Sequence, residues 1–295
     1  MVCHSLKSTK RLYASRGQTL SNAQHCLTAL AVVASLAVPS AARAETIEWD
    51  PRFWAEAGVY LPNADTQIQL SLPDSDNGTS FSLEDDLGFD TSVESFDLTI
   101  GAKLDDNFFI EGSIFALDRS SFLTLAKMIE VEDVVYDVGV QVNSDFSSDI
   151  FRLTVGYRII ANPKVDVSIA VGAHLTTFDF GILGEASANS QTAITQQRGH
   201  DLLAPLPTIV GQVRYRPFAW LELRGRADYL DLSIDRYNGK LINLEASATA
   251  AIARNAALGV AYRFTDYEVG IDAISYEGSI EYKFEGPRIF MRFTI

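Results

Sequence analysis

The stretch GPRIFMRFTI, residues 286–295, carries the most regular alternation of the chain. Two sets of side chains take turns along it: Ile289, Met291, Phe293 and Ile295 against Phe290, Arg292 and Thr294. A period of two predicts a β-strand whose two faces meet different surroundings. Chain ends usually pack poorly, so a strand that stays regular to its last residue is expected to have a firm pairing partner.

The same alternation recurs along the chain and predicts ten strands. The predicted strands span 51–62, 93–104, 107–118, 147–160, 164–176, 205–216, 219–231, 241–252, 256–266 and 277–295. The seventh strand is ended at Leu230–Asp231, because the alternation inverts its phase there. Gly286–Pro287 is interpreted as a bulge inside a long last strand.

The connections between these strands alternate between short and long. Four are turn-like, at 105–107, 161–164, 216–219 and 253–256, and five are longer and polar, at about 63–92, 119–145, 177–203, 232–240 and 266–276. Tight turns on one side and long loops on the other are typical of a transmembrane β-barrel. We therefore predict an all-β antiparallel barrel of about ten strands, within a range of eight to twelve. In a closed barrel the last strand pairs with the first. A soluble periplasmic β-sandwich is the alternative fold.

The first 44 residues have the composition of a cleaved signal peptide. They contain five of the 24 Lys and Arg residues and none of the 38 Asp and Glu residues, and an apolar run of twelve residues, Leu27–Val38, precedes Ala42 and Ala44. A charged start, a short apolar run and an A-x-A site predict cleavage before Glu45. An uncleaved anchor is the alternative. The predicted barrel domain, 45–295, has a net charge of −19 and no cysteine, because Cys3 and Cys26 precede it. Nucleic acid is an unsuitable partner for such a charge.

Aromatic residues gather near both ends of the predicted strands. One group is Phe53, Trp54, Phe108, Phe109, Tyr157, Tyr215, Phe218, Trp220, Phe290 and Phe293; the other is Tyr60, Phe115, Phe178, Tyr229, Tyr262 and Tyr282. Two aromatic belts are expected where a barrel meets the two membrane interfaces.

These patterns together resemble the small bacterial outer-membrane β-barrel family, the porin-like superfamily of OmpA, OmpX and OmpW. In that family the last strand also serves as the assembly signal, which here would be Gly286, Ile289, Met291, Phe293 and Ile295. The terminal Ile295 departs from the phenylalanine that is usual in the family. The resemblance implies an outer-membrane location and a monomer. It also implies partners: outer-membrane lipid, lipopolysaccharide, the barrel-assembly machinery and periplasmic chaperones.

Charged residues at inward positions are the main functional candidates. By the phases above they are Glu56, Asp97, Glu111, Arg152, Asp166, Arg214, Glu222, Arg224, Arg226, Asp228, Glu245, Arg263, Glu281, Lys283 and Arg292. The densest run is the lumen charge ladder Glu222, Arg224, Arg226 and Asp228. It predicts either a cross-strand ion-pair ladder or the lining of an anion-selective constriction. Ten strands lie near the size at which side chains fill a barrel, so the predicted lumen is largely plugged.

No cofactor or definite metal site is predicted. The segment 74–86 resembles a calcium loop through Asp74, Asp76 and Asp85, but Gly78 and Thr79 break the pattern. We predict that the chain is not an enzyme, because its candidate residues Ser187, Ser190, His200 and Asp201 form no recognisable motif. A structural envelope role or a minor small-solute pore is expected. The alternatives are an adhesin-like surface protein acting through acidic loops and an outer-membrane hydrolase, either a protease or a lipid A-modifying enzyme.

Overall fold

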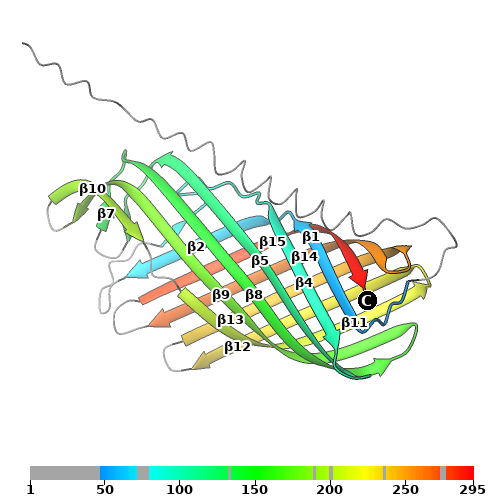
Figure 1. Ribbon diagram of the computed structural model, residues 1–295. Helices are drawn as coiled ribbons and strands as arrows, with labels where there is room; N and C mark the ends of the chain where they lie inside the picture. Colours follow the sequence, from blue (N-terminus) through cyan, green and yellow to red (C-terminus); the bar gives the residue numbers. More distant parts are fainter. Residues whose placement is uncertain are drawn as a thin grey trace, which may run out of the picture. The chain divides into compact units, whose positions relative to one another are not determined.

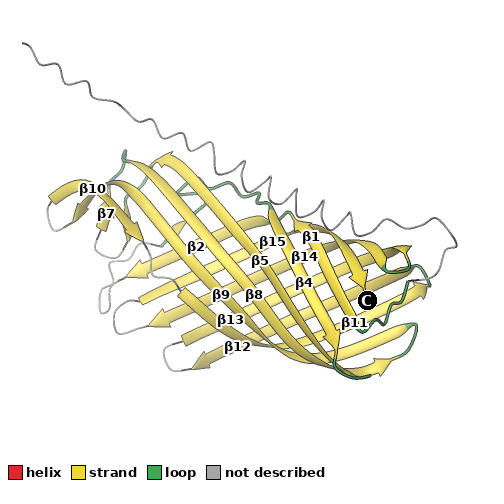
Figure 2. Cartoon of the chain, in the orientation of Figure 1, coloured by secondary structure: helices red, strands yellow, loops and turns green. Residues whose placement is uncertain are grey.

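A computed structural model describes residues 47–71, 80–131, 134–188, 191–198, 202–234, 237–272 and 277–295. They belong to one compact unit, Ala44–Ile295, which is an antiparallel barrel (Figure 1). Every regular element in the described ranges is a strand (Figure 2). No helix among these residues is long and apolar enough to cross a membrane. The predicted signal peptide, 1–44, lies outside the described residues and stays a prediction.

The wall has ten strand positions, as the alternation predicted. The first is shared by β1 (Phe53–Tyr60) and β2 (Asn63–Ser71), which both pair with β15. The others are β4 (Ser95–Lys103), β5 (Phe108–Thr124), β8 (Gln141–Ala161), β9 (Val165–Ala188), β11 (Leu202–Phe218), β12 (Leu221–Ile234), β13 (Tyr237–Ala253), β14 (Ala256–Asp272) and β15 (Glu277–Thr294). Four short strands lie off the wall: β3 (Phe81–Ser82), β6 (Ile129–Val131), β7 (Val134–Tyr136) and β10 (Gln191–Arg198).

The barrel closes where the last strand meets the first. β1 and β15 are antiparallel, from Trp54 opposite Thr294 to Tyr60 opposite Arg288. The backbone N–H of Phe53 donates to Ile295 O at 3.0 Å, and Ile295 N–H donates to Phe53 O at 2.9 Å. The predicted closure is therefore confirmed, and it leaves no unpaired strand edge facing lipid. It also excludes the β-sandwich.

The apolar side chains change faces partway along several long strands, and β8 shows the change clearly. In β8, Phe151 and Leu153 face outward while Arg152 is buried, yet farther along the same strand Phe146 and Val142 are buried and Asp145 is exposed. The strand itself continues through the change. The apolar exterior marks the part of the wall that faces lipid, and the polar exterior marks the part beyond the membrane.

This inversion corrects several predicted strand ends. The change at Leu230–Asp231 is not an end, because β12 continues to Ile234. The predicted loop 177–203 is largely strand, since β9 runs to Ala188 and pairs with β10. The predicted bulge at Gly286–Pro287 is also wrong, because the register between β14 and β15 is continuous there. Apolar side chains lie on the outward face where the strand meets lipid and on the inward face where it meets the core. This change of face requires no break in the strand.

The aromatic belts are only partly as predicted. At the turn-side end of the wall, the predicted residues Phe53, Phe108, Tyr157, Tyr215, Phe218 and Trp220 are exposed and form a belt, whereas Trp54, Phe109 and Phe290 of the same predicted group are buried. At the other end, Tyr60, Phe115, Phe178 and Tyr282 are buried inside the barrel. Those four residues lie at inward positions and build the core. Tyr229 and Tyr262 of the same predicted group are exposed on the outer face, so each predicted belt is confirmed only in part.

Candidate functional site

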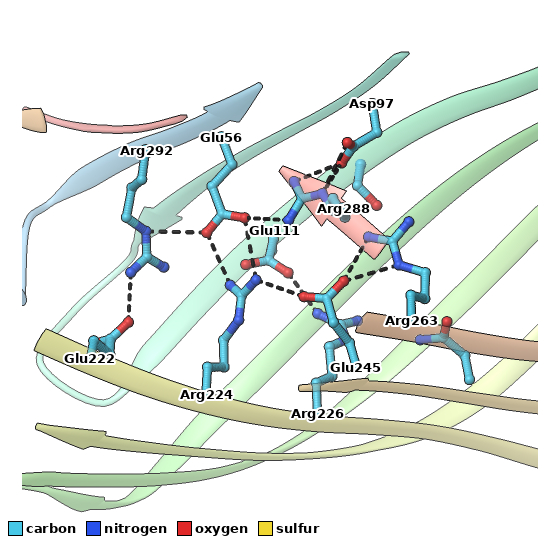
Figure 3. Close-up of polar contacts among 12 residues, drawn as sticks. Glu56, Asp97, Glu111, Glu222, Arg224, Arg226, Glu245, Arg263, Arg288 and Arg292 are labelled. Carbon is cyan, nitrogen blue, oxygen red and sulfur yellow. Dashed lines mark hydrogen bonds and ion pairs between the residues drawn. The ribbon is translucent and has the colours of Figure 1, made fainter. Parts of the chain in front are cut away.

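The lumen is the candidate site, and its turn-side half is filled by buried charges. Inward positions alternate with lipid-facing ones, so each strand sends its polar residues into the same narrow interior. Figure 3 shows arginines and carboxylates from separate strands converging on one another. In this half of the lumen the described carboxylates are Glu56, Asp97, Glu111, Asp166, Glu222, Asp228 and Glu245, and each is buried.

Glu56 on β1 is the first hub of this network. Its carboxylate accepts from Arg224 Nη1 at 3.0 Å and from Arg288 Nη1 at 3.2 Å, and it lies 3.2 Å from Arg292 Nε. Only 1% of Glu56 is exposed. Because these arginines come from β12 and β15, a single carboxylate ties strands that are distant in sequence (Figure 3).

Glu245 on β13 is the second hub. It pairs with Arg263 Nη2 at 2.7 Å and with Arg224 Nη2 at 2.8 Å. Arg224 therefore bridges Glu245 to Glu56 across the lumen (Figure 3). On the other side of the network, Asp97 binds Arg288 Nη2 at 2.6 Å. Buried charges linked in this way satisfy one another, whereas an unpaired one would cost several kcal/mol.

The four residues of the predicted ladder all lie in this network, and most of their ion pairs cross to other strands. Glu222 binds Arg216 and Arg292, and Arg224 binds the two hubs. The pair that stays within the strand is Arg226 Nε with Asp228 Oδ1, at 2.9 Å. Most partners therefore lie on other strands. The spacing identified the charged residues but did not indicate which strands would supply their partners.

Asp228 also lies beside a buried histidine, His174. Its Oδ2 lies 3.7 Å from His174 Nε2 and accepts from Asn243 Nδ2 at 2.6 Å. His174 Nδ1 lies 2.9 Å from Tyr267 Oη. His174 is 2% exposed, so this cluster lies within the packed interior of the barrel.

Above the charges, aromatic side chains fill the other half of the lumen. Tyr60, Phe115 and Phe284 meet edge to face, with ring centroids 5.7–6.2 Å apart. Tyr282 and Phe146 continue the stack at 5.5 Å. Such edge-to-face contacts add stability beyond the area they bury. The sequence placed Tyr60, Phe115 and Tyr282 in an outward aromatic belt and did not predict this inward layer, although its residues stand at every second position of their strands.

Two external segments fold over this layer and join its core. After β3, the side chains of Leu83, Leu87 and Phe89 are buried, and so are those of the β6–β7 hairpin: Ile129, Val131, Val134 and Tyr136. Glu84 fixes the first segment, because it pairs with Arg119 of β5 and accepts from Thr66 N–H at 2.8 Å. We call these segments, 80–93, 129–131 and 134–136, the external cap.

A short segment closes the opposite mouth. Trp49 Nε1 donates to Ala219 O at 2.8 Å, and Asp50 lies 3.1 Å from both Lys103 Nζ and Arg158 Nη1. Burial alone would raise the pKa of Asp50, but the hydrogen bond from Lys103 and the charge of Arg158 lower it below its ordinary value. We call residues 47–51 the turn-side lid.

The remaining predicted site residues are placed as follows. Glu281 and Lys283 were predicted to face the lumen, but both are exposed on the outer face of β15. That error follows from the bulge assumed at Gly286–Pro287, which would have shifted their phase. Asp85 is exposed in the turn after β3. Asp74, Asp76, Ser190, His200 and Asp201 lie outside the described residues. No metal-binding group of His, Cys, Asp and Glu is present in the described ranges.

The residues of the predicted assembly signal divide between the two faces of β15. Ile289 and Ile295 are exposed on the outer face, whereas Gly286 lies at a buried position of the inner face. Met291 and Phe293 lie on the outer face and are partly exposed. Their role in assembly stays a prediction.

Comparison with known proteins shows the fold. No protein-family model matches the chain, and no curated protein matches it. The outer-membrane protease OmpT from Escherichia coli superposes with a TM-score of 0.52 and 12% identity, covering 86% of this chain and 100% of that one. The translocator domain of autotransporter NalP from Neisseria meningitidis gives 0.44 and 11%, covering 94% and 97%. OprG from Pseudomonas aeruginosa gives 0.37 and 11%, covering 85% and 99%.

The predicted resemblance to outer-membrane β-barrels is thus confirmed at the level of fold. The barrel closes on itself, and the exterior of the turn-side part of its wall is apolar. A closed barrel with such an exterior is a membrane-spanning structure. The fold of this chain is accordingly that of the outer-membrane β-barrels, as the resemblance implied.

Proposed function

We propose that this chain is a structural outer-membrane barrel whose lumen is closed to solutes. The observation that carries the proposal is the network centred on Glu56, because one buried carboxylate holds arginines from β12 and β15 across the interior. A solute path through this level would have to separate several of these pairs at once. Breaking a buried pair costs about 3–5 kcal/mol.

Three further levels support the closed state. The aromatic layer lies beyond the charges, the external cap covers that layer, and the turn-side lid crosses the opposite mouth. The aromatic layer and cap form one continuous cluster of buried residues. Each level would have to move before a continuous water path could form, so the minor-pore alternative is less well supported by the geometry.

Planar-bilayer recording tests the proposal directly. We expect the folded wild-type chain to give no reproducible conductance step, because charged pairs and aromatic rings fill the lumen. A known porin, refolded and inserted in the same way, is the positive control. Folding of each sample is checked by its heat-dependent shift in gel mobility. Regular conductance steps from the folded chain would contradict the closed lumen.

Lipopolysaccharide is the partner that we propose for the outer wall. Just beyond the apolar belt, acidic side chains face outward: Asp65, Asp118, Asp145, Asp149, Asp179, Asp231, Asp266, Glu268, Glu281 and Glu285. Lys240 and Lys283 lie among them and pair across strands with Glu268 and Asp266 at 3.6 and 3.8 Å. Hard divalent cations take oxygen ligands, so they could join these carboxylates to lipid phosphates.

The lipid proposal predicts a dependence on Mg²⁺. Vesicles of phosphorylated lipid A should bind the detergent-solubilised barrel more tightly in Mg²⁺ than in a matched concentration of monovalent salt. Converting Glu281 and Glu285 to glutamine should weaken this binding. The control replaces Gln67 and Gln69 by asparagine, which alters the outer wall without removing charge. We expect this control variant to bind the vesicles as tightly as the wild type. Equal binding by all variants with and without Mg²⁺ would contradict the proposal.

The proposal assigns no catalytic role to the chain. His174 is enclosed by Tyr267 and Asp228 within the lumen, where it meets other protein groups. The barrel-assembly machinery and periplasmic chaperones remain proposed partners during insertion, on the strength of the alternating last strand. A monomer is proposed as the inserted form.

A further inference from the structure

Among the described residues, one lumen arginine, Arg214, has no carboxylate partner in the ion-pair network, and it lies beside a small cavity. Below the aromatic layer, the lumen contains the seven carboxylates named above. The arginines at the same levels are Arg152, Arg158, Arg214, Arg216, Arg224, Arg226, Arg263, Arg288 and Arg292. Cations thus outnumber carboxylates on the described inward faces. All of these arginines except Arg214 lie within 4 Å of a carboxylate.

The carboxylates nearest to Arg214 are already taken. Asp166 stands opposite Arg214 in the β9–β11 register, but it binds Arg158 Nη2 at 2.7 Å. Glu222 binds Arg216 and Arg292. The contacts of Arg214 are neutral instead: its guanidinium lies 5.9 Å from the centre of the Trp54 ring. With the Gln212 amide turned to suit, the Gln212 oxygen accepts from Arg214 Nε at 3.1 Å and from Nη2 at 2.9 Å.

The cavity next to Arg214 is small, and its lining carries four basic side chains against two carboxylates, those of Glu48 and Asp50. Its lining includes Arg158, Arg214, Arg292 and Lys103, together with the Trp54 ring, and the turn-side lid covers it. Its volume is about 20 Å³, which is enough for one water-sized species. Asp50 neutralises part of this charge through Lys103 and Arg158. Neither of those two pairs reaches Arg214.

We propose that this cavity is a binding site for a monatomic anion of the chloride class. A partly buried cation without a carboxylate partner is costly, and an anion beside Arg214 and Arg292 would offset that cost. Space for one water-sized species suits a halide better than the larger phosphate or an organic acid. The ion would complete the network by supplying the negative charge that the described lumen residues lack. This site is independent of the proposed closed lumen, since an ion could bind there in a conducting barrel as well.

Thermal unfolding in two salts tests the site. Wild-type barrel in detergent is heated in sodium chloride or in sodium gluconate of equal ionic strength, and the midpoint is read from gel mobility. An ion that binds the folded state raises its stability by mass action. We expect a midpoint that rises and then saturates with chloride. We expect the midpoint of Arg214→Met not to rise with chloride. In gluconate we expect its midpoint to be higher than that of the wild type, because a buried unpaired charge has been removed.

Arg152→Met is the matched control. Arg152 is another lumen arginine, 3.8 Å from Asp228, and it does not line the cavity. We expect this variant to melt below the wild type while keeping the response to chloride. If Arg214→Met responds to chloride as strongly as the wild type, the site is overturned.

Diffraction gives a second test that needs no variant. Crystals of the wild-type chain soaked in bromide should show an anomalous bromine peak between Arg214 and Arg292. Bromine peaks confined to the protein surface, with none in this cavity, would overturn the proposal.

Discussion

Glu56→Gln is expected to lower the free energy of unfolding by about 3–5 kcal/mol, because it leaves buried arginines without part of their counter-charge. Glutamine keeps the size of the side chain and removes its charge. Arg224, Arg288 and Arg292 all contact the native carboxylate, so the loss falls on three cations at once. Glu56 is 1% exposed, so water cannot replace the lost charge.

The measurement is urea unfolding of the refolded barrel in detergent micelles. Glu285→Gln is the control, since Glu285 is exposed on the outer face of β15 and a surface change of this kind usually stays within about 0.5 kcal/mol. Similar small losses for both variants would show that the Glu56 network contributes little to stability. The structural proposal would then lose its main support.

Gly286→Ala is expected to prevent closure of the barrel. A Cβ at Gly286 would lie 2.3 Å from Leu61 O and 2.8 Å from Pro62 Cα. Both atoms belong to the backbone, at the place where β1 gives way to β2 along β15. Backbone cannot retreat as a flexible side chain can, so the seam would have to separate.

This prediction is measured as the fraction of heat-shifted, folded protein after refolding into detergent without any assembly factor. Gly225→Ala is the control, because a Cβ there meets nothing within 4 Å. We expect near-normal folding for Gly225→Ala and almost none for Gly286→Ala. If Gly286→Ala folds normally in detergent, the close approach is tolerated, and any defect in cells would point to the predicted assembly signal instead.

Alternation in the sequence predicted the strand number and the closure but not the strand lengths. The reason is visible in β12 and β15, where apolar residues face lipid at one level and the core at another. An inversion of phase therefore marks a change of surroundings along one strand. The sequence interpretation took this inversion as the end of a strand or as a bulge. It therefore placed Glu281 and Lys283 on the wrong face and did not predict the inward aromatic layer.

The candidate site was predictable in its parts and not in its pairings. Glu222, Arg224 and Asp228 were identified from their spacing, because every second residue of a strand shares a face. Their partners on β1, β13 and β15 depend on which walls face each other across the lumen. Spacing along one strand carries no such information. Arg288 was missed for the same reason as Glu281, since the assumed bulge obscured the phase around Pro287.

The seam between β1 and β15 also bears on how fast the barrel can form. Trp54 pairs with Thr294, so the contact that completes the wall joins residues from opposite ends of the described chain. Contacts of such long sequence separation carry a large loop-closure entropy and are associated with slow folding. Hairpins such as β13–β14 involve neighbouring residues and can pair early. We expect seam formation to be the slow phase of refolding, with an open, curved sheet preceding it.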